Sequence, residues 1–389
     1  MTGRNGARSG RFALAVVLGI LVGAGAAGCG SSSSHNSSSS NGGQSTSAGS
    51  AGLQAAKAEL TKASKAPTQI GVTQPLKHRP PAGRTVIWLE ANFAQSQETA
   101  DAMHAAASAA GLSFRAIDYN ASDPGTLIAA FKQALQYHPI GVALSGIQSA
   151  VWGSQIFPLY RRAHIPIVDG LAGAQPLNDV LVANLWNPKD VATGAKALAA
   201  WVAVDSDGKG QAAVVGVPDL PTLASFATSF TSALKAACPG CTSKTVAETI
   251  SDIGSPSTAN QPLVSAVQSD RSIKYLVLAD GALDPGLPSA LSGAGISGEK
   301  IVGEQPSIEN EQDTVEGKEN AFMGANFNYF GWLFLDAILR HDQGLPVPAG
   351  DGGMPNELLT KANVGTPSAQ MKAPADYQQQ FKKLWLVGS

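Results

Sequence analysis

The chain has 389 residues, a formal net charge of −2 at pH 7 and only 14% charged residues. No basic patch of the kind that neutralises nucleic-acid phosphates is visible, so we expect no nucleic-acid partner. Beyond residue 83 about 300 residues remain, which exceeds one typical hydrophobic core and predicts two lobes.

The N-terminus has the pattern of an export signal. Three arginines precede the apolar run 12–27, and Ala26-Ala27-Gly28 stands directly before Cys29. Small residues followed by cysteine resemble a bacterial lipobox, in which the cysteine is acylated, although Ala26 stands where leucine is usual. We therefore predict a signal peptide over 1–28 and a lipid on Cys29. An ordinary signal peptide cut nearby and a single membrane anchor are the alternatives, and the run of about 16 residues is short of the roughly 20 that a spanning helix needs.

Residues 29–83 begin with a serine- and glycine-rich stretch whose composition cannot form a packed core. We expect this segment to be a flexible tether that holds a soluble body off the membrane. No later apolar run approaches spanning length, so the predicted location is the extracytoplasmic face of the cell membrane.

From residue 84 short apolar strands alternate with segments that have apolar residues at helical spacing. The first run of strands is expected at 85–89, 114–117, 140–144, 165–168 and 180–183. The second is expected at 212–217, 245–250, 275–279, 301–303 and 322–324, followed by a long helix through 330–338, a strand at 357–360 and an aromatic helix through 377–384.

Repeated strand–helix–strand units of this length predict parallel sheets covered by helices on both faces. The expected fold class is therefore α/β, with two doubly wound parallel-sheet lobes joined by a multi-strand hinge. We assign 84–186 plus 327–346 to an N-terminal lobe and 187–326 plus 347–389 to a C-terminal lobe.

Cys238 and Cys241 remain once Cys29 is assigned to the lipid. A pair this close in an exported chain most simply forms a disulfide. The pair follows the apolar helical stripe from Leu223 to Leu234, so it lies at a helix end. A redox pair would lie at a helix start, where the helix dipole lowers the pKa of a thiol. We expect a structural disulfide.

The sequence motifs for cofactors and catalysis are missing or misplaced. One GxGxxG pattern lies at 23–28 inside the signal peptide, and the other, at 293–298, leads from a helix into a strand, whereas a dinucleotide loop leads from a strand into a helix. There is no GxSxG, no GxxxxGK[ST] and no His/Cys cluster at metal-ligand spacing. We expect no cofactor, no metal and no enzymatic activity.

Polar and aromatic residues gather where the predicted strands end. Open parallel sheets bind ligands beyond the carboxyl ends of their strands, because loops converge there and helix N-termini supply donors. If two lobes face each other, these ends line one cleft. The residues in question are Glu90, Asn92, Phe93, Ser145, Asp169, Asp280, Glu304 and Gln305.

The order and spacing of the elements over about 84–346 resemble the type I periplasmic binding proteins, in particular the ribose/galactose-type sugar receptors of ABC importers. The segments that carry the resemblance are 86–93 (VIWLEANF), 165–169 (IPIVD) and 184–187 (NLWN). The tail 377–385 (YQQQFKKLW) resembles exported actinobacterial solute-binding lipoproteins.

The resemblance implies a set of ligand-binding positions. Asn92 and Phe93 fall where that family has a polar residue and stacking aromatics, and Trp186 falls where the chain first crosses between lobes. Two arginines usual in the family are missing, one after Asp169 and one in the helix after Pro218. Arginine forks suit adjacent hydroxyls, so a less polar ligand is expected as an alternative to a pentose or hexose. The remaining implied positions are Ser145, Asp169, Asp280, Glu304 or Gln305, and Asn326.

The expected function is that of a monomeric, lipid-anchored solute-binding protein, which captures a small molecule between its lobes and presents it to a membrane ABC permease. One alternative is a sensory protein that delivers its ligand-bound form to a membrane receptor. A more remote alternative is an extracellular hydrolase.

Overall fold

The computed structural model describes residues 43–388, except 250–251, 253–257, 282–283, 325, 348–353, 369–370 and 372–373. The predicted signal peptide and Cys29 lie outside the described residues. The fold below is that of the unit Gly43–Ser389, within these described ranges. In its described part, no helix is both long enough and apolar enough to cross a membrane.

The N-terminal lobe is built on a five-stranded sheet in the order β2-β1-β3-β4-β5, in which every pair of neighbours is parallel. The order reverses between β1 and β3, and such a switch point opens a crevice at the carboxyl ends of the strands. The strands are β1 (Thr85–Ala91), β2 (Ser113–Tyr119), β3 (Gly141–Ser145), β4 (Ile167–Gly170) and β5 (Leu181–Leu185).

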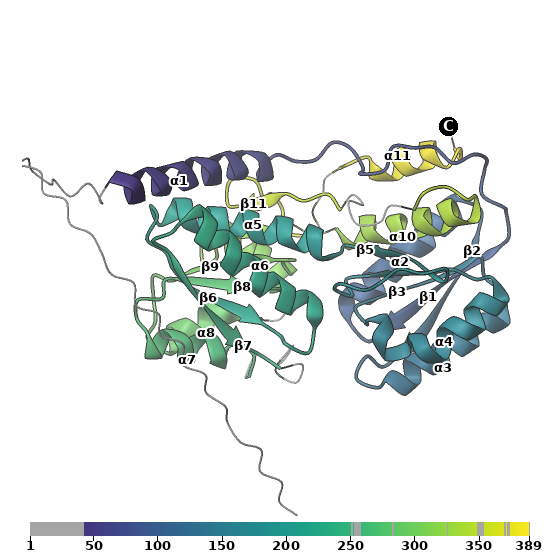
Figure 1. The fold of residues 1–389 in the computed structure, drawn as a ribbon, viewed down its shortest axis with the longest axis horizontal. Helices are drawn as coiled ribbons and strands as arrows, with labels where there is room; N and C mark the ends of the chain where they lie inside the picture. Colours follow the sequence, from purple (N-terminus) through teal and green to yellow (C-terminus); the bar gives the residue numbers. More distant parts are fainter. Residues whose placement is uncertain are drawn as a thin grey trace, which may run out of the picture. The chain divides into compact units, whose positions relative to one another are not determined.

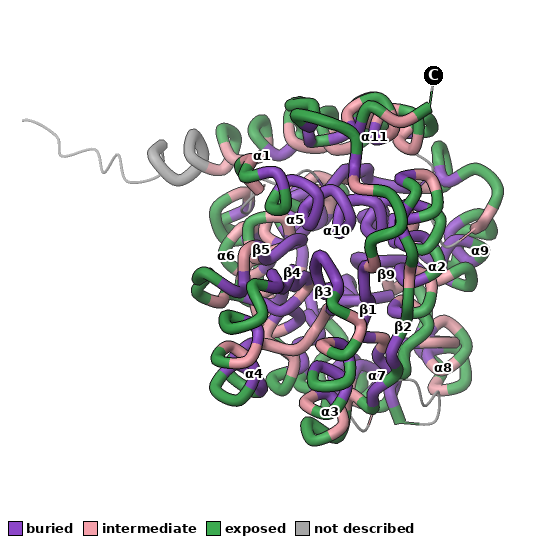
Figure 2. The backbone as a smooth tube through the Cα atoms, turned by 90° about the vertical axis from the view of Figure 1, so that its right-hand side faces the viewer, coloured by how far each residue is buried: buried purple, intermediate pink, exposed green. Residues whose placement is uncertain are grey.

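Helices cover both faces of this sheet because its central strands are apolar on both sides. Val86 and Trp88 pack in one core beside Met103, while Ile87 and Leu89 pack in a second core beside Phe131. Successive side chains of β1 thus point to opposite faces of the sheet, as the two-residue period of a strand requires. Both β1 and β3 are buried along most of their length (Figure 2). The covering helices are α2 (Ala94–Ala109) and α10 (Phe327–Asp342) on one face and α3 (Pro124–Ala134) and α4 (Ser149–Ala163) on the other.

The C-terminal lobe repeats this topology in a six-stranded sheet with the order β11-β10-β9-β8-β6-β7. All described neighbours are parallel except β10 and β11. The predicted α/β class with two doubly wound sheets is confirmed. The strands are β6 (Gln211–Gly216), β7 (Thr242–Ala247), β8 (Tyr275–Leu278), β9 (Lys300–Glu304), β10 (Ala321–Met323) and β11 (Leu358–Thr360), and the helices are α5 (Pro188–Asp205), α6 (Pro221–Ala237), α7 (Gln261–Ser269), α8 (Leu287–Gly293) and α9 (Ile308–Glu316).

The predicted disulfide is present. Cys238 and Cys241 are joined directly after α6, with their Cα atoms 5.3 Å apart. Both cysteines are buried, and Phe226 and Phe230 of the same helix are core residues. The pair therefore closes the turn between α6 and β7.

The predicted tether differs from the structure from residue 43 onward. Helix α1 (Gly43–Ala63) packs on α5 and α6 (Figure 1). Ala56 is buried, and a Cβ at Gly52 would lie 2.5 Å from the Ala237 carbonyl oxygen, so glycine permits the close approach. The second half of α1 is rich in alanine, leucine, lysine and glutamate, which are strong helix formers. The prediction treated 29–83 as one segment because of its serine-rich start, and so it missed the change in composition within α1.

Residues 64–83, here called the N-terminal strap, connect α1 to β1. Ile70, Val72 and Leu76 are buried. The strap runs past α11 (Tyr377–Leu384), where the backbone N–H of Ile70 donates to Gln380 Oε1 at 3.0 Å and that of Leu76 donates to the Leu384 carbonyl at 2.9 Å (Figure 1). The strap is therefore part of the packed fold.

Helix α11 lies against α10, although the sequence assigned all of 347–389 to the C-terminal lobe. The rings of Trp332 and Trp385 stack with centroids 5.2 Å apart, and Phe381 packs beside both. Helix α10 itself packs on α2 of the N-terminal lobe. The aromatic residues of the two segments are about 50 positions apart in the chain and meet only in the folded protein. Their pairing therefore cannot be inferred from where either helix lies in the sequence.

Candidate functional site

A cavity of about 310 Å³ lies at the carboxyl ends of both sheets. It adjoins both switch points, between β1 and β3 in one lobe and between β6 and β8 in the other, which is where open α/β sheets bind ligands. Residues of both lobes line it: Ala91, Phe93, Gln95, Ser96, Tyr119, Ala121, Ser122, Ser145, Gly146, Ile147, Leu171, Leu220, Pro221, Thr222, Leu223, Asp280, Gln305 and Phe327.

Four predicted site residues line this cavity, namely Phe93, Ser145, Asp280 and Gln305. Phe93 directly precedes α2, and the residue is 48% exposed. Ser145 is the last residue of β3, and Asp280 follows β8. The structure thus brings together four side chains that are far apart in the sequence.

Asn92 supports the wall behind Phe93. Its Oδ1 accepts a hydrogen bond from the Ala121 backbone N–H at 3.0 Å, which joins the loop after β1 to the loop after β2. Glu90 lies on the α2 side of β1, where burial and the nearby Asp118 and Asp101 raise its pKa. Neither residue is among those that line the cavity.

Asp169 is completely buried at the end of β4. Its carboxylate accepts from the Gly170 backbone N–H and from Gln175 Nε2, both at 2.8 Å, and Gln175 Oε1 accepts from the Ser149 backbone N–H at 2.8 Å. Burial raises the pKa of Asp169 to about 8 despite these two hydrogen bonds. Asp169 therefore holds the loop that leads to Leu171 and does not itself line the cavity.

Trp186, Glu304 and Asn326 lie around the crossings between the lobes, outside the cavity lining. The Trp186 ring packs on Phe327 and Phe330, with centroids 5.5 and 5.4 Å away. Asn326 caps α10 by accepting from the Tyr329 N–H at 2.7 Å. Glu304 is buried against α5, where a Cβ at Gly194 would meet its Oε1 at 1.8 Å.

The two lobes touch beside the cavity. Thr222 Oγ1 of α6 donates a hydrogen bond to the Leu171 carbonyl of the other lobe at 2.5 Å. A Cβ at Gly173 would lie 2.9 Å from Pro221 Cβ, so the backbones approach closely there. Sequence patterns cannot reveal such contacts, because they depend on how the lobes face each other.

Leu171 and Gln305, which line the cavity, have left-handed backbones with φ of 53° and 49°. Trp186, at the first lobe crossing, has φ of 46°. Side chains other than glycine rarely adopt this conformation, and such strained residues concentrate at ligand sites and hinges. These three positions carry no distinguishing mark in the sequence.

The C-terminal lobe places further acids behind Asp280. Asp284, Glu248, Glu304 and Glu319 are all buried. Burial raises the pKa of Glu248 to about 7 and that of Glu319 to about 8, and it also raises the pKa values of Asp284 and Glu304 well above the usual range. Asp280 lies close enough to raise the pKa of both Asp284 and Glu304 further.

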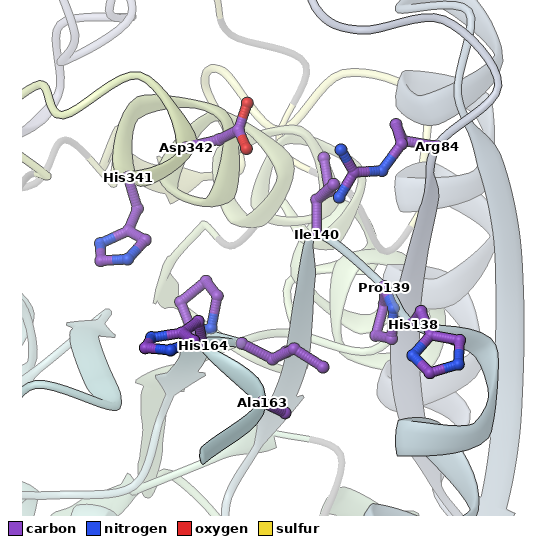
Figure 3. A pocket seen from close by; sticks show the side chains of 10 residues that line it. Arg84, His138, Pro139, Ile140, Ala163, His164, His341 and Asp342 are labelled. Carbon is purple, nitrogen blue, oxygen red and sulfur yellow. The ribbon is translucent and has the colours of Figure 1, made fainter. Parts of the chain in front are cut away.

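A second hollow, of about 350 Å³, lies at the amino ends of the N-terminal-lobe strands (Figure 3). Arg84, His138, His164, His341 and Asp342 line it. Within the described ranges, no group of three or more His, Cys, Asp or Glu side chains is arranged to hold a metal ion. The hollow is at the opposite end of the strands from both switch points, so the interlobe cavity is the stronger candidate.

No protein-family model matches the chain, and no curated protein sequence matches it. Solved structures do match. A sugar-binding protein of a sugar ABC transporter from Bacillus halodurans is 18% identical with a TM-score of 0.63, covering 73% of this chain and 100% of that one. An ABC sugar transporter subunit from Rhodobacter sphaeroides 2.4.1 is 17% identical with a TM-score of 0.61, covering 72% and 99%. A periplasmic ribose ABC transporter protein from Conexibacter woesei is 14% identical with a TM-score of 0.62, covering 73% and 94%.

Proposed function

We propose that this chain, whose fold is that of the type I periplasmic binding proteins, captures a small solute between its lobes for an ABC permease in the membrane. The observation that carries the proposal is the cavity at the carboxyl ends of both sheets, lined by both lobes. The similar structures belong to sugar ABC transporters, which supports a transport-associated binding role rather than catalysis.

The lobe contacts support capture by closure. A solute that binds both walls favours the state in which the lobes touch, and a permease distinguishes that state by its shape. The Thr222–Leu171 hydrogen bond and the close approach of Gly173 to Pro221 are contacts of this state. We infer that the protein acts as a monomer in this role.

Phe93, Ser145, Asp280 and Gln305 are the side chains that we assign to the solute. The first two belong to one wall and the last two to the other. Asp169 and Asn92 do not contact the solute in this proposal; they position cavity-lining loops through their hydrogen bonds. The walls are otherwise largely apolar, which suits a solute that is less polar than an ordinary hexose.

A thermal-unfolding screen against sugars, polyols, nucleosides and aromatic acids tests the capture of a solute. A ligand at 100 times its Kd stabilises the folded protein by about 2.7 kcal/mol, which raises the unfolding temperature measurably. A screen without any stabilising solute would count against the proposal.

We also propose that Cys29 bears the lipid that anchors the protein on the extracytoplasmic face of the cell membrane. The lipobox-like Ala26-Ala27-Gly28-Cys29 supports it. A Cys29→Ala variant is expected to leave the membrane fraction for the soluble fraction after detergent-free lysis. Equal membrane retention of the variant and the wild type would contradict the anchor.

A further inference from the structure

The charged side chain on the described cavity wall is acidic. Among the described residues that line the cavity, Asp280 is the only aspartate or glutamate, and there is no lysine, arginine or histidine. Asp280 is 8% exposed. A solute that enters therefore meets a single carboxylate on a wall that is otherwise neutral.

Two buried acids, Glu248 and Asp284, lie behind Asp280 without lining the cavity. The carboxyl groups of Glu248 and Asp284 face each other, and in the described part of the chain no donor from any other residue reaches their four buried oxygens. Neither Glu248 nor Asp284 has an ion pair with a lysine or arginine there. Buried carboxylates are costly unless protons or cations compensate them. Burial raises the pKa of both acids, which favours their protonated, uncharged forms, so Asp280 is the acid that a solute meets.

The remaining walls suit an apolar body beside that cation. Phe93 at the rim and Phe327 at the lobe crossing present aromatic rings, and Leu171, Leu220 and Leu223 add aliphatic surface. Aromatic faces attract cations within about 6 Å of the ring centre. A neutral polyol gains little here, since none of the described lining residues offers a guanidinium to bind adjacent hydroxyls.

We propose that the solute carries a positively charged nitrogen beside an apolar or ring-shaped body, and that Asp280 receives this nitrogen. The proposal rests on the proposed function and narrows its ligand class from small solutes in general to organic cations.

Calorimetric titration with matched pairs of probes tests this inference. The pairs are 2-phenylethylamine with 2-phenylethanol and D-glucosamine with D-glucose, in which an ammonium group replaces a hydroxyl. We expect the better-binding amine to bind at least tenfold more tightly than its neutral partner. Asp280→Asn, which removes the charge and keeps the shape, is expected to reduce this preference at least tenfold.

Asp219→Asn is the matched control, because Asp219 is an exposed aspartate after β6 that does not line the cavity. It should leave the amine preference within twofold of the wild type. If neutral partners bind as tightly as the amines, or if folded Asp280→Asn keeps the preference, the inference is wrong and solute capture still stands. If no probe binds and the broader screen also finds no solute, both proposals fall.

Discussion

Replacing Asp336 by alanine is expected to lower the free energy of unfolding by about 3–5 kcal/mol, because it leaves a buried guanidinium without its counter-ion. Asp336 and Arg340 are 0% and 1% exposed, and Arg340 Nε donates to Asp336 Oδ2 at 2.6 Å. Trp385 Nε1 donates to the other carboxylate oxygen at 2.8 Å, and Arg340 also donates to the Gln74 carbonyl of the N-terminal strap at 2.6 Å. One carboxylate thus joins α10, α11 and, through Arg340, the strap.

Urea unfolding of the wild type and of Asp336→Ala measures this loss of unfolding free energy. Asp342→Ala is the matched control, since Asp342 is an exposed aspartate at the end of the same helix, and exposed substitutions usually change stability by less than about 0.5 kcal/mol. A double replacement, Asp336→Leu with Arg340→Met, is expected to recover much of the loss, because apolar residues of similar volume often substitute for a buried ion pair. If Asp336→Ala lowered the free energy of unfolding by less than about 1 kcal/mol, Asp336 would not be the counter-ion on which the buried Arg340 depends.

A chain that starts at Pro81 is expected to be far less stable than one that starts at Gly43. The shorter chain loses Ile70, Val72 and Leu76, and full burial of one such side chain contributes about 1.5–3 kcal/mol. It also exposes the faces of α5 and α6 that α1 covers. After subtraction of the entropy of ordering the strap, we expect a loss of at least about 3 kcal/mol.

A third chain, starting at Ser64, separates the two contributions because it keeps the strap and lacks only α1. We expect its stability to lie between the other two. Leu76→Ala in the longer chain should cost about 2–5 kcal/mol by itself, as buried leucines generally do. If all three chains unfolded at the same urea concentration, the strap would have no part in the fold.

The alternation of apolar strands and helical faces predicted most of the fold, because each central strand must be buried on both sides of a parallel sheet. The same criterion missed α9, whose sequence is polar and which begins instead with a capping box at Ser307 and Asn310. It also missed α1, since a helix that packs through alanine and glycine has no strong apolar stripe. The pairing of α11 with α10 depends on long-range contact that no local pattern encodes.

The site was predictable in location and less so in detail. Position at a strand end places a residue near the cleft, but it does not say whether the side chain faces the cavity or its own loop. Ser145 and Asp280 line the cavity, whereas Asp169 turns to Gly170 and Gln175. Thr222 and Tyr119 were missed, because a threonine in a first helical turn and a tyrosine in an edge strand have ordinary structural roles.

A steric block in the cavity between the lobes tests most directly whether a solute binds there. Ser145→Trp places a bulky side chain into a cavity of about 310 Å³, while Ser154→Trp places the same side chain on the exposed surface of α4 in the same lobe. With a solute from the screen, calorimetry is expected to show at least a 100-fold loss of affinity for folded Ser145→Trp and no change for Ser154→Trp. Unchanged affinity in folded Ser145→Trp would contradict the account.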